Sequence, residues 1–411
     1  MIRLKKYGLQ DAKQFLFVAL FAFPILSLKV TNALFILFSL LVVFLFIKQK
    51  QSFSFKEYLP YFLFTLPFIP YLIEFLVYPN NKIIQFELEK KLFFFAAPLV
   101  LYIDSESVKL QLKNASVCFI TGVALLSFIS IIYLMGSGNL FLESNYLNGA
   151  YGLRFVFENF SGLHPTYYGL FSTTASLWII HYLENYSGKY KIVMISFLIV
   201  LLVVNMLIAS KMPLLIMLLG LLWIGYKKTS NKLKLGIIYL SFFAGLTALI
   251  FVIPSLKNRL LEIPHFFTFQ MVNNTIFERF IIFNCSKSIF LSDIITGVGA
   301  RNIQGVLDYC YVWFGFSKGA LIHLNPHNQY LSIGICYGLG ILVLFLLTLF
   351  VLFLRIKNSA AGIIFFFSLI FIMFTESILE RQMGVYYFLF FALLFMMQIK
   401  NGEKKDRRLS E

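Results

Sequence analysis

Long apolar runs are the feature of this sequence that most constrains its fold. Hydrophobic residues make up 59% of the 411 residues, against about 45–50% in soluble domains. A run of about 17–25 apolar residues can cross a bilayer as a helix, and a helix in lipid satisfies its own backbone polar groups. We therefore predict an all-α, polytopic integral membrane protein with about twelve spans, at residues 14–28, 31–47, 58–77, 92–103, 115–135, 163–183, 190–210, 212–226, 233–253, 328–354, 359–375 and 384–399.

The distribution of basic residues predicts the orientation of these spans. With the N-terminus in the cytoplasm, the inner segments hold 22 Lys and Arg and the short outer segments hold 7. Six more lie in the long outer segment 254–327, and the positive-inside rule discounts long loops. We therefore expect both termini in the cytoplasm, including the basic tail 401–411. The net charge of +16 then reflects membrane topology, and no nucleic acid partner is expected.

The long outer segment divides the chain into regions. We expect N-terminal membrane helices over 1–135 and a second membrane region over 136–400 that contains the periplasmic loop 254–327. Long loops in compact proteins are commonly functional. The stretch "NNTIFERFIIFNCSKSIF" in this loop predicts a helix, either lying on the membrane or packed on its neighbours. The sequence leaves open whether Cys285 and Cys310 pair.

The stretch Asn325-Pro326-His327 has the form of a helix start. Asn is a favoured N-cap and Pro is favoured at the first helical position, so we expect His327 in the first turn of a helix that enters the membrane from outside. The helix dipole disfavours a charged imidazole there, and a neutral imidazole can act as a general base. The alternative is an interfacial histidine bonded to a neighbouring carbonyl.

Two further motifs have both a functional and a structural interpretation. His164 precedes Pro165 in "SGLHPTYYGLF", where it either contacts a substrate or caps a helix beside an interfacial tyrosine belt. Gly334 and Gly338 are four residues apart and predict close helix packing.

Basic residues are scarce in the outer segments, so each is a candidate ligand for phosphate. The guanidinium group presents a planar fork of donors to phosphate oxygens, although pairing with nearby acids is an equally good explanation for any one arginine. The basic candidates and the acids near them are Arg154, Lys211, Arg279, Arg301, Arg381, Glu278, Glu376 and Glu380.

The sequence carries no motif that predicts a metal or nucleotide cofactor. "GVGARN" lacks the third glycine and the strand–helix context of a dinucleotide site, so we expect Gly297 and Gly299 to be turn residues. A Walker A motif, HExxH and GxSxG are absent from the sequence.

A large outer loop followed by His327-Asn328-Gln329-Tyr330-Leu331 resembles the O-antigen ligase and O-antigen polymerase superfamily. "GVGARN", "ERFIIF" and "HPTYYGL" add to the resemblance, which covers about 150–400. It implies an all-helical, GT-C-like fold of about a dozen spans that works at the periplasmic face without a metal or nucleotide. It also implies a glycan donor on undecaprenyl pyrophosphate. The acceptor is a sugar hydroxyl, on lipid A–core in ligases and on another repeat unit in polymerases.

The resemblance also assigns roles to residues. The essential histidine of the family would be His327, and an essential loop arginine would be Arg279. Family members usually carry Arg after a Ser at the turn between the seventh and eighth helices, but here Lys211 follows Ser210 and lacks the bidentate fork. Other substrate contacts are expected from His164, Arg301, Asn328 and Tyr330, with Glu376 or Glu380 orienting His327 or an arginine.

We therefore expect an inverting, lipid-linked-oligosaccharide glycosyltransferase of the inner membrane that takes part in lipopolysaccharide or surface polysaccharide assembly. A polymerase that joins repeat units fits the sequence equally well. The alternatives of other classes are a lipid-linked glycan transporter or flippase and a non-catalytic scaffold. Transporters tend to carry charges near the middle of the membrane, whereas the charges here cluster at helix ends, which favours an interfacial enzyme.

Overall fold

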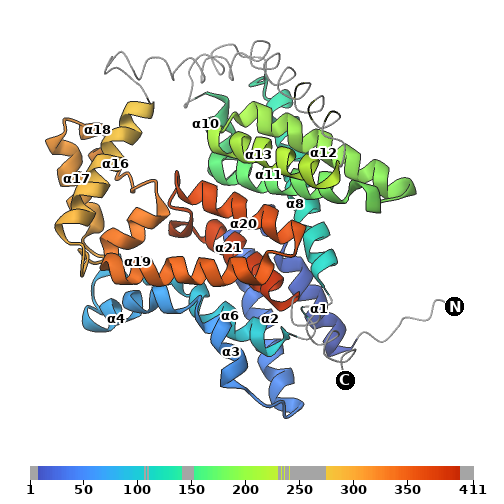
Figure 1. The fold of residues 1–411 in the computed structure, drawn as a ribbon, viewed down its shortest axis with the longest axis horizontal. Coiled ribbons are helices and arrows are strands. Elements are labelled where there is room, and N and C mark those ends of the chain that lie inside the picture. Colours follow the sequence, from blue (N-terminus) through green and yellow to red (C-terminus); the bar gives the residue numbers. More distant parts are fainter. Residues whose placement is uncertain are drawn as a thin grey trace.

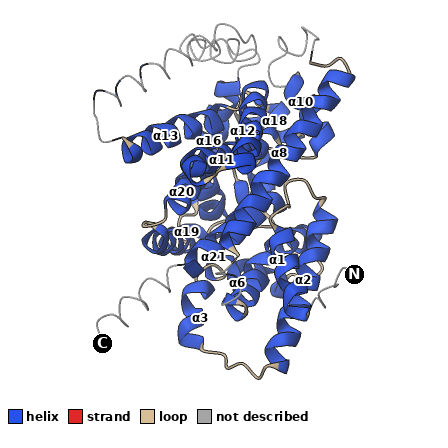
Figure 2. Cartoon of the chain, turned by 90° about the vertical axis from the view of Figure 1, so that its right-hand side faces the viewer, coloured by secondary structure: helices blue, strands red, loops and turns tan. Residues whose placement is uncertain are grey.

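A computed structural model describes residues 8–105, 111–140, 152–229 and 275–398 of the chain, together with the single positions 108, 233, 236 and 240. Every regular element in these ranges is a helix (Figure 2), which confirms the prediction of an all-α protein. The tail 401–411, the segment 254–274 and nearly all of the predicted span 233–253 lie outside the described residues.

The helices of the chain up to residue 103 form a layer at the lower side of Figure 1, and the next helix, α8, extends to the upper right, where it packs on α11 (Pro165–Tyr182) and α12 (Gly188–Ile208). Prolines lie inside α3 and at the starts of η1 and α4, and proline removes a helical hydrogen bond. The predicted span 58–77 is accordingly a bent pair of helices with an angle of 58° between them. The elements are α1 (Leu9–Leu20), α2 (Leu28–Lys48), α3 (Phe55–Phe62), η1 (Leu66–Phe68), α4 (Ile69–Val77), α5 (Lys82–Lys91), α6 (Phe93–Ile103) and α8 (Leu112–Gly136).

The remaining helices form two groups in Figure 1, one beside this layer and one at its left end. The first group is α10 (Leu153–Ser161), α11 (Pro165–Tyr182), η3 (Leu183–Asn185), α12 (Gly188–Ile208), α13 (Lys211–Lys228), α19 (Gln329–Ile356), α20 (Ala360–Met373), η5 (Ile378–Glu380) and α21 (Gln382–Gln398). The second group is α16 (Thr275–Ser292), α17 (Ile303–Trp313) and α18 (Ser317–Leu321).

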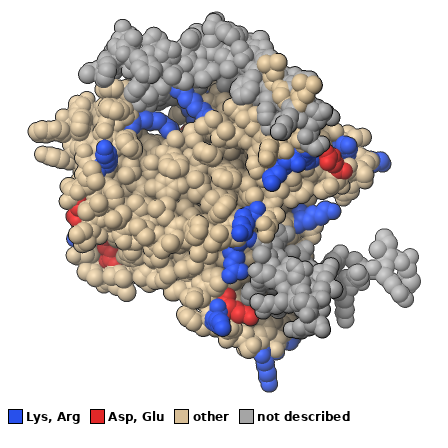
Figure 3. All heavy atoms as spheres, in the orientation of Figure 1, with Lys and Arg blue, Asp and Glu red and all other residues tan. Residues whose placement is uncertain are grey.

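The chain has the helices of a membrane protein. Four described helices, α2, α8, α12 and α19, are long and apolar enough to cross a membrane, and the bent pair of α3 and α4 brings the number to five. The face drawn in Figure 3 has a broad area without charged side chains, and Lys and Arg gather towards its right-hand side. Other predicted spans coincide with shorter apolar helices such as α20 and α21, so the number twelve stays a prediction.

Two helices form the interior of the molecule. Every residue of α11 from Pro165 to Ile179 is buried, and so is every residue of α21 from Val385 to Met397. A helix that is apolar on all sides belongs inside a large protein or a membrane. The hydroxyls of α11 find partners within the bundle, as in the 2.8 Å hydrogen bond between Thr174 and Tyr387.

Helices α16 and α17 are joined by a disulfide between Cys285 and Cys310, which answers the question of their pairing. A buried apolar cluster also holds the two helices together, with Ile281, Ile282 and Ile289 from α16 and Leu307 and Tyr311 from α17. Helix α16 packs on α19 as well. The predicted outer helix therefore packs on its neighbours.

Helix α19 is kinked at Tyr337 and Gly338, where the backbone leaves the helical conformation. The loop after α16 packs against α19 at this kink. Val298 and Gly299 in the loop donate their backbone N–H groups to the carbonyl oxygens of residues 335 and 336 at 2.8 and 2.9 Å. A Cβ at Gly338 would lie 2.1 Å from the carbonyl oxygen of Ile295. A Cβ at Gly334 would lie 2.9 Å from the ring of Phe290 in α16. The prediction of close packing at these two glycines is therefore confirmed, and Gly338 also permits the kink. Gly299 has φ +83° and is a turn residue, as predicted.

Candidate functional site

The histidine of the "NPHN" stretch lies just before a helix. Helix α19 begins at Gln329, and its N-cap is Asn328, whose side-chain oxygen accepts from the backbone N–H of Leu331 at 3.0 Å. Asn325 closes a separate turn by accepting the backbone N–H of His327 at 2.9 Å. The prediction that His327 lies in the first helical turn was therefore wrong, because the second asparagine caps the helix and the first caps the preceding turn.

His327 has an uncommon backbone conformation. Its φ of 46° lies in the left-handed region, which is sparsely populated by residues other than glycine. Such conformations cost roughly 1–3 kcal/mol and cluster at functional sites. The hydrogen bond from its backbone to Asn325 helps to hold this conformation.

A buried carboxylate gathers three side chains around it. Glu376 is 5% exposed. Its Oε2 lies 3.1 Å from Nδ1 of His327. Its Oε1 accepts from Nη2 of Arg279 at 3.0 Å and from the hydroxyl of Thr166 at 3.4 Å. Burial by itself raises the pKa of Glu376, but the hydrogen bond and charge of His327 and the charge of Arg279 outweigh it and lower the pKa to about 2. The group is therefore a carboxylate at any physiological pH.

Arg279 is held by both branches of its guanidinium group. Nη1 donates to the carbonyl oxygen of Thr375 at 3.2 Å while Nη2 donates to Glu376. Its sequence neighbour Glu278 pairs instead with Lys318 at 3.2 Å. The arginine side chain remains 47% exposed, so it is accessible to a ligand.

These groups line a cavity of about 450 Å³. Four basic and two acidic side chains face it, together with both histidines singled out in the sequence, and apolar residues form another part of its wall. The charged residues and histidines are Arg154, Lys211, Arg279, Lys318, Glu278, Glu376, His164 and His327, and the apolar residues include Met212, Pro213, Ile282, Phe316, Ile322 and Leu324.

His164 is the N-cap of α11, with Pro165 at the first helical position as the sequence predicts. Its Nδ1 accepts from the backbone N–H of Thr166 at 3.4 Å. Lys211 is the first residue of α13, and the side chain of Ser210 before it accepts from Nη2 of Arg154 at 3.3 Å. His164 therefore has the structural role predicted for it and also lies in the cavity.

Two other expected site residues pack away from this cavity. Arg301 stacks over the ring of Tyr78 at 3.6 Å, and its Nε lies 3.8 Å from Glu74. The Glu74 carboxylate also accepts the backbone N–H groups of Ala300 and Arg301 at 2.9 and 3.2 Å. Glu380 binds Lys91 at 3.0 Å. These contacts hold α4, α5 and the loop after α16 in place.

Asn328 and Tyr330 also make structural contacts. Besides capping α19, Asn328 donates to the carbonyl oxygen of Phe374 at 3.2 Å. The hydroxyl of Tyr330 donates to the carbonyl oxygen of Ile370 at 3.3 Å, and its ring packs on Phe374. Both residues join the start of α19 to the end of α20, which carries Glu376 just beyond it.

The structure adds Thr166 and Lys318 to the site. Lys318 could have been singled out from the sequence, because basic residues are scarce in the outer segments. Thr166 follows the His164-Pro165 motif but gives no signal of its own. Its contact with Glu376 joins residues 210 positions apart in the chain, and no local pattern predicts that.

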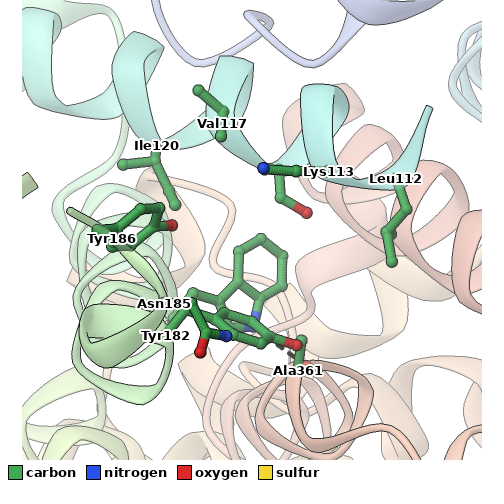
Figure 4. A pocket seen from close by; sticks show the side chains of 10 residues that line it. Leu112, Lys113, Val117, Ile120, Tyr182, Asn185, Tyr186 and Ala361 are labelled. Carbon is green, nitrogen blue, oxygen red and sulfur yellow. Dashed lines mark hydrogen bonds between the residues drawn. The ribbon is translucent and has the colours of Figure 1, made fainter. Parts of the chain in front are cut away.

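A second cavity of about 450 Å³ lies near the other end of α11 (Figure 4). It is lined mainly by apolar and aromatic side chains from α8, α11 and the following turn, and Lys113 is the charged residue among them. No group of three or more His, Cys, Asp or Glu side chains that could hold a metal ion is found among the described residues. The first cavity is the candidate site, because the charged residues and both histidines gather there.

No protein-family model matches the sequence, and a search of curated proteins finds no match either. Inferences about function therefore rest on the motifs and on the arrangement of the site.

Proposed function

We propose that this chain is a glycosyltransferase of the bacterial inner membrane that transfers a glycan from undecaprenyl pyrophosphate to the hydroxyl of an acceptor sugar. The observation that carries the proposal is the position of Glu376, which holds His327 and Arg279 at one cavity. These are the two residues to which the resemblance to O-antigen ligases assigns essential roles. They come from segments nearly fifty residues apart, and the structure brings them to the same carboxylate.

His327 has the arrangement of a general base. An ionised carboxylate can only accept hydrogen bonds, so Nδ1 of His327 carries a proton and the lone pair of the neutral ring is on Nε2. In the transfer, the acceptor oxygen attacks the anomeric carbon, and the bond from that carbon to the phosphate oxygen breaks. The hydroxyl proton moves to Nε2, and Glu376 stabilises the resulting imidazolium. A positioned base contributes about 10²–10⁴-fold.

The charge of the cavity suits the leaving group. Among the residues that the structure describes, four basic and two acidic side chains line it, so positive side chains outnumber negative ones by two. A pyrophosphate diester carries two negative charges. Preorganised positive charge at the place where negative charge develops is commonly the largest catalytic contribution. Arg279 and Lys211 would neutralise the departing lipid pyrophosphate.

The membrane placement in this proposal has the cavity on the periplasmic side, both termini in the cytoplasm, and about twelve spans in a GT-C-like arrangement. Two independent features support the outer placement. Basic residues are concentrated in the opposite segments, and the disulfide in the outer segment suits an oxidising compartment such as the periplasm.

Transfer by the purified protein tests the proposal directly. The assay supplies an undecaprenyl-pyrophosphate-linked glycan and lipid A–core without metal or nucleotide. Glycan joined to lipid A–core identifies a ligase, and longer chains on the lipid carrier identify a polymerase. If liposomes show movement of the lipid-linked glycan across the bilayer and no new glycosidic bond, the protein is a transporter and the enzymatic proposal is wrong.

A further inference from the structure

The two histidines of the cavity differ in which nitrogen is protonated. Nδ1 of His164 accepts the backbone N–H of Thr166, so in the neutral ring the proton is on Nε2. Nδ1 of His327 faces the Glu376 carboxylate, so its proton is on Nδ1. Within one cavity, His164 therefore offers an N–H donor at Nε2, and His327 offers a lone pair at the same atom.

Helix capping alone does not explain a histidine at position 164. Favoured N-caps are Ser, Thr, Asp and Asn, and the other side-chain caps of the described helices follow that rule. They are Ser27, Asn81, Asn328 and Ser359. A smaller side chain would cap α11 at least as well, so the imidazole has a further use.

The surroundings of His164 place it beside two of the basic residues of the cavity. The hydroxyl of Ser210 donates to the carbonyl oxygen of Pro165 at 3.4 Å and accepts from Arg154. Lys211 follows directly and also lines the cavity. His164 is joined to the base only indirectly, because Thr166 donates to Glu376. His164 therefore lines the cavity together with Arg154 and Lys211.

We propose that Nε2–H of His164 donates a hydrogen bond to a phosphate oxygen of the lipid pyrophosphate, on the side of the cavity formed by Arg154 and Lys211. This inference rests on the proposed function and deepens it. The two histidines then serve opposite partners, since His327 accepts the proton of the acceptor hydroxyl while His164 holds the leaving group. A neutral donor adds a directional contact without placing a third positive charge beside Arg154 and Lys211.

His164→Asn separates this contact from capping. Asparagine is a favoured N-cap, so α11 stays capped, but its NH₂ donor lies nearer the backbone than Nε2 of imidazole and does not reach the same phosphate oxygen. We expect an unchanged Tm. The Kd of purified protein for undecaprenyl pyrophosphate and the KM for the lipid-linked donor should both rise, on the order of tenfold to a hundredfold, as for a lost hydrogen bond to a charged group. His164→Gln, which carries an N–H donor on a longer side chain, should recover part of the affinity.

The outcomes separate this inference from the proposed function. Wild-type affinity for undecaprenyl pyrophosphate in His164→Asn would overturn the role of His164 even if the enzyme transfers glycan. If wild-type protein binds this lipid in a His164-dependent way but forms no glycosidic bond, the proposed function is wrong and the binding role stands. Wild-type protein that does not bind undecaprenyl pyrophosphate would overturn both.

Discussion

Replacing Glu376 by glutamine tests the centre of the site. The carboxylate is 5% exposed and receives hydrogen bonds from His327, Arg279 and Thr166. Glutamine has nearly the same shape, but it removes the charge and replaces one acceptor oxygen by an NH₂ group that faces a donor. The change therefore isolates the electrostatic role of the residue from its packing.

The magnitudes follow from these contacts. A buried hydrogen-bonding group that loses its partner costs about 1–3 kcal/mol. Arg279 is partly exposed, so water can replace its lost contact, and we expect the free energy of unfolding to fall by no more than this range. The effect on catalysis should be larger, because His327 loses the group that fixes its tautomer and stabilises its charged form. We expect kcat to fall about 10²–10⁴-fold, which is the contribution of a positioned base.

The assay compares Glu376→Gln with Glu380→Gln. Glu380 is also enclosed and bound to a cation, Lys91, but it does not line the cavity. Both variants should unfold at lower temperature, whereas only Glu376→Gln should lose most of its transfer from lipid-linked donor. Equal activity losses in the two variants, or a Glu376→Gln enzyme with wild-type kcat, would refute the role of Glu376 in orienting the base.

The pKa of Glu376 adds a dependence on pH. Its folded pKa is about 2, below the value of about 4.3 for an unperturbed glutamate. A lowered pKa contributes stability that is complete above the unfolded value and is lost as pH falls towards the folded value. Wild-type protein should therefore lose this contribution between about pH 4.5 and pH 2, and thermal unfolding of Glu376→Gln should not show it.

The remaining predictions concern the phosphate contacts, the base and the topology. Arg279→Lys should lose most activity because a point charge cannot replace a bidentate fork, whereas Lys211→Arg should be tolerated; full activity of Arg279→Lys in the transfer assay would exclude the bidentate role. His327→Asn keeps a residue that tolerates a positive φ and should fold but lose transfer at least about 100-fold, while His323→Asn, also at a positive φ, should stay active. A cysteine introduced between α17 and α18 should react with an impermeant thiol reagent in spheroplasts, and one placed just after α13 should not; the reverse labelling would invert the topology.

Several local features could be predicted from the sequence because neighbouring residues determine them. The length of the apolar runs predicts helices in lipid, since only a helix of that length satisfies its own backbone there. The His164-Pro165 cap, the helix Thr275–Ser292 and the turn at Gly299 were each predicted, and the structure confirms them. Each depends on contacts within a few residues of the chain.

Where two residues give the same local sequence signal, only the tertiary structure decided which of them has the predicted role. Asn325 and Asn328 are both favourable N-cap residues. In the structure, Asn325 closes a turn and Asn328 is the N-cap of α19. Arg279 and Arg301 are both scarce outer arginines, but only Arg279 reaches the cavity, since Arg301 is held by Glu74.

Glu376 and Glu380 are the clearest example of two similar residues that only the tertiary structure distinguishes. Four residues apart in an α-helix, they would share a face, but Glu376 lies in the irregular segment after α20 and Glu380 is the last residue of the short helix η5. One carboxylate therefore faces His327 and the other faces Lys91. The sequence by itself determined that the chain is a helical membrane protein with polar motifs at helix ends. Only long-range packing decided which of those groups meet, because a contact between segments far apart in the chain leaves no local pattern in either one.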